Sequence, residues 1–285
     1  MTKKQFLPIK IFMVIIIFLI ILVVPQLVFS NDAGTEPGLT PEKEMSRLEK
    51  IKASGELVVG TSADYPPYEF HLLIDEEGEL VGIDIDIAKV IAQELGVQLE
   101  IKDLIFSRIF NALESGQIDM AIAGLSPTEE RQKVANFSDV YYQAIQCVII
   151  RKDNSERIKT IEDLRGKKVG VQKDSIQEDM AKGQIHGAEF DVRETIEELI
   201  IILNKGLVDG IILEKPVGDS YIHRNKNFVS LCAEEKFSSL LGSAIAVKKG
   251  DDDLLKEINR ILAKLKKEGK IDEFIETAKM LSNKR

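Results

Sequence analysis

Two stretches of the sequence share a pattern that would bring polar side chains together. The pattern L-x2-G-x-[IV]-D-x2-I occurs over residues 113–122 and again over residues 203–212. We interpret each copy as a helix end, a glycine cap and a short strand, used once in each of two similar lobes, although such joints also recur by coincidence in α/β proteins. Both strands would end at the carboxyl edge of their sheets, where open α/β folds place ligands. Ser126 follows the first strand and Glu214 the second, so a hydroxyl and a carboxylate would face one cleft from opposite sides.

The histidines and glycine-rich segments form no catalytic or metal-binding pattern in the sequence. His71, His186 and His223 are scattered without the spacing of metal ligands. The segment GLSPT (residues 124–128) departs from the nucleophile elbow G-x-S-x-G because Thr128 follows Pro127, and no P-loop is present. We therefore expect no metal, no cofactor and no catalytic residue.

Composition limits the class of protein further. The chain has 285 residues, of which 44% are hydrophobic and 30% charged, a balance typical of globular proteins rather than of disordered or collagen-like chains. This length fits one large or two medium domains. Because 38 Lys and Arg residues face 47 Asp and Glu residues, the net charge is −9, which argues against nucleic-acid binding.

The N-terminus predicts export. Residues 1–10 carry three lysines and no acid, and residues 11–24 form an unbroken apolar run. Val28 and Ser30 give an acceptable cleavage site before Asn31, so we interpret residues 1–30 as a secretory signal peptide, with an uncleaved signal anchor as the alternative. In either case the remainder lies in the periplasm or on the extracellular face of the membrane, which it touches only through residues 1–30 if these are retained.

The two cysteines leave two possibilities open. Cys147 and Cys232 are too few for a disulfide scaffold or a four-cysteine zinc site. A bridge between them is possible in an exported chain, but we favour two buried free thiols, which pack as small apolar side chains.

The body of the protein, after a polar linker at residues 31–41, alternates strands with helices. We expect strands over residues 56–61, 97–102, 120–123, 168–171, 189–192 and 210–213, with a hairpin formed by residues 72–75 and 79–81. Helices are expected over residues 42–52, 84–95, 107–115, 175–182, 194–205, 216–223, 251–267 and 271–280. Strands and helices that alternate in this way predict an α/β fold with mostly parallel sheets covered on both faces.

Several ordered motifs carry a resemblance to a known family. They are GTSADYPPYEF (residues 60–70), LVGIDIDIAKVIAQELG (residues 80–96) and AGLSPTEERQKVANFSDVYY (residues 123–142), extended by residues 161–175 and 208–217. With these motifs the chain resembles the bacterial extracellular solute-binding proteins of family three, the polar amino-acid-binding components of ABC importers. The resemblance covers nearly the whole body and is more specific for the family than for the ligand.

The resemblance implies a type II periplasmic-binding-protein-like fold, with two lobes, two hinge strands and a ligand cleft between the lobes. Lobe 1 would hold residues 42–141 and 243–285, and lobe 2 residues 142–242. The hinges would lie within residues 142–150 and 239–247. The implied partners are a free amino acid and an ABC permease and ATPase complex, and we expect a monomer.

The resemblance also assigns candidate residues for the two charged groups of an amino acid. Arg131 matches the family's carboxylate-binding arginine, although the sequence around it would also suit a solvent-exposed arginine. Ser126 offers a hydroxyl and a backbone N–H, and Thr128 would cap the short helix that presents Arg131. Glu214 stands where the family usually has an ammonium-binding aspartate, with the alternative of a carboxylate that stabilises a helix N-terminus.

Other positions match the walls of the family's ligand site. Tyr65 and Phe106 match aromatic walls, Phe106 having a core role as its alternative. Backbone contacts are implied for Ala123, Gly124 and Leu125, and the ligand loop of lobe 2 would contribute Gln172, Ser175 and Ile176. The sequence KDSI at residues 173–176 departs from the family's usual loop and puts its carboxylate contact in doubt, with Ser175 as the first candidate.

The identity of the ligand is left open by the motifs. Family members selective for basic amino acids often carry an acid two positions after Gly60, where this chain has Ser62. Glu69 can still reach a guanidinium or ammonium group stacked on Tyr65, so we expect a polar and possibly basic amino acid (Arg, Lys or His). The alternatives are an exported cyclohexadienyl or arogenate dehydratase on the same fold, with Glu214 or Glu69 as general acid, and a membrane-anchored sensor.

Overall fold

The computed structural model describes residues 44–72, 78–143, 145–232 and 241–284. Met45–Arg285 form one compact unit. Within the described ranges, no helix is both long and apolar enough to cross a membrane. The signal segment predicted over residues 1–30 and the linker over residues 31–41 lie outside the described residues and stay predictions.

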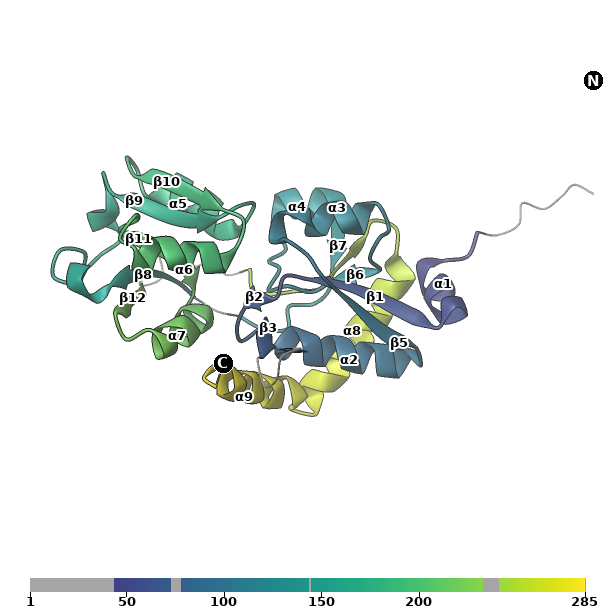
Figure 1. Cartoon of the computed structure of the whole chain (residues 1–285). Helices are drawn as coiled ribbons and strands as arrows, with labels where there is room; N and C mark the ends of the chain where they lie inside the picture. The colour runs from purple at the N-terminus through teal and green to yellow at the C-terminus, as the bar shows by residue number, and fades with distance from the viewer. Residues whose placement is uncertain (1–43, 73–77, 144, 233–240, 285) are drawn as a thin grey trace, which may run out of the picture. The chain divides into compact units, whose positions relative to one another are not determined.

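The first large sheet has the strand order β5-β1-β6-β13-β7 (Figure 1). Its parallel part consists of β1 (Glu56–Thr61), β5 (Gln98–Asp103) and β6 (Met120–Ala121). Strand β13 (Ala246–Lys248) runs antiparallel to β6 and to β7 (Ala135–Phe137). We call the part of the molecule built on this sheet lobe 1. The chain therefore returns to lobe 1 near its C-terminus to complete the sheet.

The helices of lobe 1 bury apolar faces spaced three and four residues apart. In α2 (Ile83–Leu95), for example, Ile83, Ile87 and Ile91 are fully buried, and full burial of such a side chain stabilises the fold by roughly 1.5–3 kcal/mol. The other helices of this lobe are α1 (Arg47–Ser54), α3 (Ile109–Glu114), α4 (Glu129–Val134), α8 (Asp252–Lys267) and α9 (Lys270–Ser282).

The second large sheet has the order β10-β9-β11-β8-β12, and we call the part built on it lobe 2. Its parallel strands are β9 (Lys168–Gln172), β10 (Glu189–Arg193) and β11 (Gly210–Glu214). Strand β8 (Gln146–Arg151) is antiparallel to both β11 and β12 (Phe228–Cys232). Figure 1 shows these strands together with α5 (Ile176–Gln184), α6 (Ile196–Asn204) and α7 (Lys215–Arg224). Short 3-10 turns complete the described elements at Phe106–Arg108, Lys152–Asn154 and Glu162–Leu164.

The repeated sequence pattern forms the same structural unit in both lobes. Asp119, between α3 and β6, accepts a hydrogen bond from the backbone N–H of Val58 at 2.7 Å. Asp209, between α6 and β11, accepts one from the N–H of Lys168 at 3.0 Å. Each aspartate thus ties the start of its own strand to the neighbouring parallel strand. The pattern therefore forms, in each lobe, a joint that orders two parallel strands.

A small antiparallel sheet, β2-β3-β4, carries the aromatic motif of lobe 1. It consists of β2 (Asp64–Tyr65), β3 (Glu69–Leu72) and β4 (Glu79–Val81). The predicted hairpin is therefore present, but its first strand starts at Glu69 rather than Leu72, and residues 73–77 lie outside the described residues. In this register Tyr65 lies opposite Glu69.

Several helix boundaries differ from the expectations. Helix α1 begins at Arg47, because Ser46 and Glu49 form a capping box there. The predicted helix over residues 107–115 is split into a 3-10 turn and α3, and Ser107 does not cap it: the Ser107 Oγ donates to Glu194 at 2.7 Å instead. A hydroxyl that finds a charged acceptor in the other lobe makes a stronger bond than a local cap.

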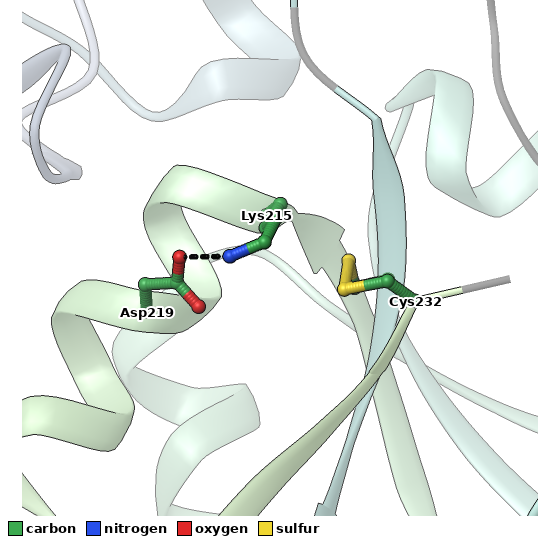
Figure 2. The surroundings of a disulfide bond; sticks show 4 residues. Lys215, Asp219 and Cys232 are labelled. Atoms are coloured by element: carbon green, nitrogen blue, oxygen red, sulfur yellow. Dashed lines mark hydrogen bonds and ion pairs between the residues drawn. A yellow bond between two sulfur atoms is a disulfide. The ribbon is translucent and has the colours of Figure 1, made fainter.

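The two cysteines form a disulfide, so the expectation of free thiols was wrong. Cys147 in β8 and Cys232 in β12 are opposite partners in an antiparallel pair, with their Cα atoms 4.2 Å apart, and Figure 2 shows the bridge. Opposite positions of antiparallel strands lie within disulfide range, and this register could not be read from two isolated cysteines in the sequence.

The chain passes from lobe 1 to lobe 2 before Cys147 and returns to lobe 1 after Cys232. Tyr142 and Ser243 form an isolated antiparallel bridge where the two passages lie side by side. The strands of each sheet come from the residue ranges expected for each lobe, whereas the exact lobe bounds and the hinge ranges stay predictions.

Candidate ligand-binding site

A pocket lies between elements of both lobes. Its lining includes most of the predicted site: Tyr65, Glu69, Phe106, Ala123, Gly124, Arg131, Gln172 and Ile176. The lining also contains Ser62, Asp64 and Gln177, which were not among the predicted site residues. The motifs of lobe 1 and the loop after β9 thus meet around one cavity.

Arg131 enters this pocket from the first turn of α4. Thr128 caps that helix as predicted, accepting a hydrogen bond from the Arg131 N–H at 3.2 Å. The guanidinium donates to the backbone oxygen of Ser126 at 3.1 Å and, across the cleft, to that of Asp174 at 3.0 Å. It also lies over the rings of Phe106 and Phe110, at 5.5 and 5.4 Å from their centroids. The alternative of a solvent-exposed arginine does not hold.

Burial affects the Arg131 charge without removing it. Loss of solvation lowers the pKa of Arg131 to about 10, against the favourable influence of Asp179 and Asp174. The guanidinium therefore remains a cation at neutral pH. Since it has five N–H donors and the two backbone oxygens occupy two of them, donors remain for a carboxylate.

The floor of the pocket on the lobe 1 side is aromatic. The rings of Tyr65 and Tyr68 are stacked, with centroids 5.5 Å apart. Gly124 has a φ of +54°, and a Cβ there would lie 3.3 Å from the Tyr65 ring. Glycine therefore allows the backbone to approach this ring both conformationally and sterically. The Gly124 N–H donates to the Asp84 carboxylate at 2.8 Å, which fixes the strand end next to the ring.

Three buried carboxylate oxygens of the pocket lack hydrogen-bond partners among the described residues. The Asp64 Oδ1 and both carboxylate oxygens of Glu69 have no hydrogen-bond partner among the described residues. Burial raises the pKa of Asp64 to about 7, and it raises the pKa of Glu69 well above its usual range, with Asp84 adding to the effect. Unpaired buried carboxylates are costly, so these two groups mark a place suited to positive charge.

A second layer of acids and tyrosines lies behind the pocket. The Glu214 carboxylate accepts hydrogen bonds from the Tyr68 hydroxyl and, at 3.5 Å, from Gln146. Gln146 in turn accepts from Gln177 at 3.0 Å, and Gln177 also donates to the Tyr65 hydroxyl at 3.3 Å. Burial raises the pKa of Glu214 to about 7. The layer therefore connects residues of both lobes and holds a further acid with a raised pKa.

Four predicted site residues do not line the pocket. Leu125 is buried in the core, and Ser126 reaches the site only through its backbone oxygen. The Ser175 hydroxyl caps α5, donating to Gln172 at 2.7 Å and accepting from Glu178 at 3.2 Å, so it is already engaged. Glu214 lies in the second layer. Their roles as ligand contacts stay predictions.

Asp64 and Gln177 were missed for different reasons. Asp64 belongs to the quoted motif, two positions beyond Ser62, the position at which family members selective for basic amino acids often carry an acid. Gln177 follows the predicted Ile176 on the first turn of α5, and nothing in its own type distinguishes it from a surface glutamine. Among the described residues, no group of His, Cys, Asp and Glu has a metal-binding arrangement.

A two-lobed α/β molecule with a polar pocket between its lobes has the architecture of a solute-binding protein. The chain belongs to the bacterial extracellular solute-binding proteins, family 3, whose family model matches residues 57–278. The resemblance inferred from the motifs is thereby confirmed, and so is the expected fold class.

One relative and two solved structures show which individual proteins this chain is similar to. The arginine-binding extracellular protein ArtP of Bacillus subtilis is 34% identical over 221 residues, which are 76% of this chain and 84% of ArtP. The substrate-binding protein AbpA from Streptococcus pneumoniae, solved bound to L-arginine, is 37% identical with a TM-score of 0.79 and covers 83% of this chain and 100% of its own. An ancestral amino-acid-binding protein, AncCDT-1, described as a precursor of cyclohexadienyl dehydratase, is 35% identical with a TM-score of 0.74, covering 82% of this chain and 99% of its own.

Proposed function

We propose that this protein binds a basic amino acid, with L-arginine as the first candidate, outside the cytoplasm and presents it to the permease and ATPase of an ABC importer. The observation that carries the proposal is the charge set of the pocket. The half-buried guanidinium of Arg131 shares the cavity with two buried acids, Asp64 and Glu69, which together have three carboxylate oxygens without a hydrogen-bond partner among the described residues. A basic amino acid offers a carboxylate to the guanidinium and a side-chain cation to these two acids, and its α-ammonium group needs a further acid.

Each part of the ligand has a matching group in this arrangement. Arg131 takes the α-carboxylate through its remaining donors. Glu214 is assigned to the α-ammonium, since its carboxylate has lone pairs beyond those used by Tyr68 and by the long bond from Gln146. Asp64 and Glu69 then face the side-chain cation, with the faces of Tyr65 and Phe106 against its aliphatic stem. The names of ArtP and AbpA support the same ligand class.

The test is a thermal-shift screen of the purified mature chain with the twenty amino acids, followed by calorimetry of those that stabilise it. We expect arginine to raise Tm most, with a dissociation constant near micromolar, equivalent to about −8 kcal/mol. Glutamine, which has a similar length without the cation, is the matched control and should bind more weakly. Heat only with glutamate or aliphatic amino acids would contradict the proposal.

We further infer that the protein acts as a binding protein and not as an enzyme. The dehydratase alternative is favoured by one feature, the raised pKa of Asp64 and Glu69, which would suit a general acid, together with the similarity to AncCDT-1. Incubation with prephenate and with arogenate separates the two functions. We expect no aromatic product from either, and the appearance of phenylpyruvate or phenylalanine would favour the enzyme.

A further inference from the structure

Asp64 makes two hydrogen bonds to lobe 2 from one short strand and has one carboxylate oxygen left without a partner among the described residues. Its Oδ2 accepts a hydrogen bond from the backbone N–H of Ile196 at 2.6 Å, and its backbone oxygen accepts one from the Tyr221 hydroxyl at 2.9 Å. Its Oδ1 is buried without a partner, and Asp64 lines the pocket. Ile196 and Tyr221 belong to α6 and α7 of lobe 2, so this lobe 1 residue joins the pocket to both helices.

The N–H of Ile196 is a particular kind of donor. Ile196 is the first residue of α6, a helix of 9 residues, and the first amides of a helix have no partner within it. The side chain of the cap residue Thr195 accepts a hydrogen bond from the N–H of Glu198 at 3.2 Å. The N–H of Ile196 donates to Asp64 instead. A carboxylate that accepts from a helix N-terminus gains from the charge-assisted bond and from the helix dipole, whereas a protonated carboxyl group gains much less.

The surroundings of Asp64 disfavour the ionised form of its carboxylate. Its burial raises the pKa to about 7, and Glu197 of α6 and Asp103 of β5 act in the same direction, while the bond from Ile196 opposes them. The largest influences on the pKa of Asp64 include no Lys or Arg side chain. A cation at Oδ1 would therefore convert Asp64 to the ionised form that holds α6 most strongly.

We propose that Asp64 is a positioning residue that couples the side-chain charge of the ligand to the attachment of α6: the oxygen Oδ1 meets the ligand cation, and Oδ2 of the same carboxylate holds the N–H of Ile196 from the other lobe. This inference rests on the proposed function, because it needs a cationic ligand in the pocket. It predicts that a cationic ligand tightens the contact between the lobes more than a neutral ligand of the same shape.

The test measures amide hydrogen exchange at Ile196 at pH 7, with the full mature chain saturated with either arginine or citrulline, its uncharged isostere. We expect arginine to slow exchange of the Ile196 N–H at least tenfold more than citrulline does. The Glu198 N–H, which bonds within its own helix turn, is the internal reference and should respond equally to the two ligands. This comparison needs no variant and so does not depend on the folding of a mutant.

The same measurement on Asp64→Asn, with arginine, tests the residue itself. Asparagine keeps an oxygen for Ile196 but has no charge, so the extra protection by arginine should disappear. Ser107→Ala is the matched control, since it removes another contact between the lobes, to Glu194, that has no oxygen facing the pocket. There the difference between arginine and citrulline should persist.

The outcomes separate the two proposals. If the wild-type protein binds arginine but protects Ile196 equally with both ligands, or if Asp64→Asn retains the extra protection, the coupling is wrong and the proposed function stands. If the wild-type protein binds neither arginine nor another basic amino acid, both proposals fall. If citrulline does not bind, the coupling is tested by comparing exchange of the Ile196 N–H in the wild type and in Asp64→Asn, both with arginine bound.

Discussion

The guanidinium of Arg131 is the only cation among the described residues that line the pocket, and its position is fixed by contacts from both lobes. Its backbone belongs to a capped helix turn, and its charge lies over two aromatic rings. A side chain held in this way is already oriented before a ligand arrives, so little conformational entropy is lost on binding. Arg131 is therefore the residue at which loss of the side chain should affect affinity most.

For Arg131→Ala we expect arginine affinity to fall at least 100-fold. Each charge-assisted hydrogen bond to the ligand carboxylate contributes about 1.5–3 kcal/mol, and two of them exceed that factor. The fold should persist, because truncation also removes the cost of burying a guanidinium. Calorimetry measures the affinity and circular dichroism the fold. Lys133→Ala, which truncates an exposed cation on the same helix, is the control, and equal affinities for the two variants would mean that the pocket is wrongly assigned.

In contrast to Arg131, Glu69 is a buried side chain whose two carboxylate oxygens have no hydrogen-bond partner among the described residues. Glu69→Gln removes this acid and should raise the Tm of the ligand-free protein at pH 8, because a carboxyl group whose pKa is raised in the folded state destabilises that state increasingly as the pH rises above the unfolded pKa. The same change should lower the affinity for arginine about tenfold or more and should lower the affinity for glutamine much less. Thermal shift and calorimetry with the two ligands give both readouts, with Glu130→Gln, an exposed acid, as control. An unchanged preference for arginine over glutamine would exclude Glu69 from recognition of the side chain.

At the scale of elements, the disulfide joins the two antiparallel strands of lobe 2 next to the polar layer behind the pocket. Cys147 follows Gln146 directly, and Gln146 contacts both Glu214 and Gln177. On the neighbouring helix, Lys215 and Asp219 pair at 2.5 Å, as Figure 2 shows. The bridge therefore stabilises the strand that carries Gln146 without itself lining the pocket.

The double variant Cys147→Ala, Cys232→Ala should lose about 2–5 kcal/mol of unfolding free energy. The two cysteines are separated by 85 residues, and a bridge that closes a long loop restricts the unfolded chain strongly. Urea unfolding of the two proteins measures the difference, and the reduced wild type should match the variant. Arginine affinity should change by less than about tenfold, since the bridge does not touch the pocket. Unchanged stability would indicate that the bridge does not form in solution.

The elements that the sequence predicted best are those with local signals. The glycine caps, the periodic apolar face of α2 and the two repeated joints depend on neighbouring residues, and their helices and strands were expected within a few positions. Strands β7, β8, β12 and β13 were not predicted as sheet strands, because their partners are distant in the chain. The pairing of Cys147 with Cys232 was not predicted for the same reason.

The site was predictable to the extent that its residues lie in motifs shared with the family. Arg131 and Tyr65 were identified through this resemblance, since residue type alone would also have suited a solvent-exposed arginine. By contrast, the engagement of the Ser175 hydroxyl by its own helix and the unpaired state of Asp64 depend on contacts that only the folded molecule defines. The resemblance thus identified aromatic and cationic groups that line the pocket, and packing decided which polar groups remained available.

For the whole molecule, three of the described hydrogen bonds between the lobes end on carboxylates. Tyr68 donates to Glu214, Ser107 to Glu194, and the N–H of Ile196 to Asp64. Asp84, whose pKa burial raises to about 6, adds a further acid beside the pocket and accepts from the Tyr141 hydroxyl. If the ligand is the cation proposed above, protons and ligand compete for the same group of carboxylates, which links ligand affinity to pH.

The sign of this linkage follows from the raised pKa values. Asp64 and Glu214 have a pKa of about 7 in the ligand-free fold and near 4 when unfolded. Between pH 4 and pH 7 the unfolded chain ionises first, so the ligand-free protein should lose stability as the pH rises through this range. A bound cation favours the ionised carboxylates, so arginine binding should release protons and strengthen by about tenfold or more from pH 5 to pH 7.5.

Calorimetry at pH 6 in buffers of different ionisation enthalpy measures the protons released, and titrations across the range measure the affinity. Glutamine is the control ligand: without a side-chain cation it should release fewer protons than arginine, and its affinity should depend less on pH. Since the acids lie where both lobes contribute, the stabilisation of the protein by arginine should also grow with pH while that of the ligand-free protein declines. Proton uptake on arginine binding, or an affinity that falls toward pH 7.5, would show that the buried acids do not serve as counter-charges for the ligand.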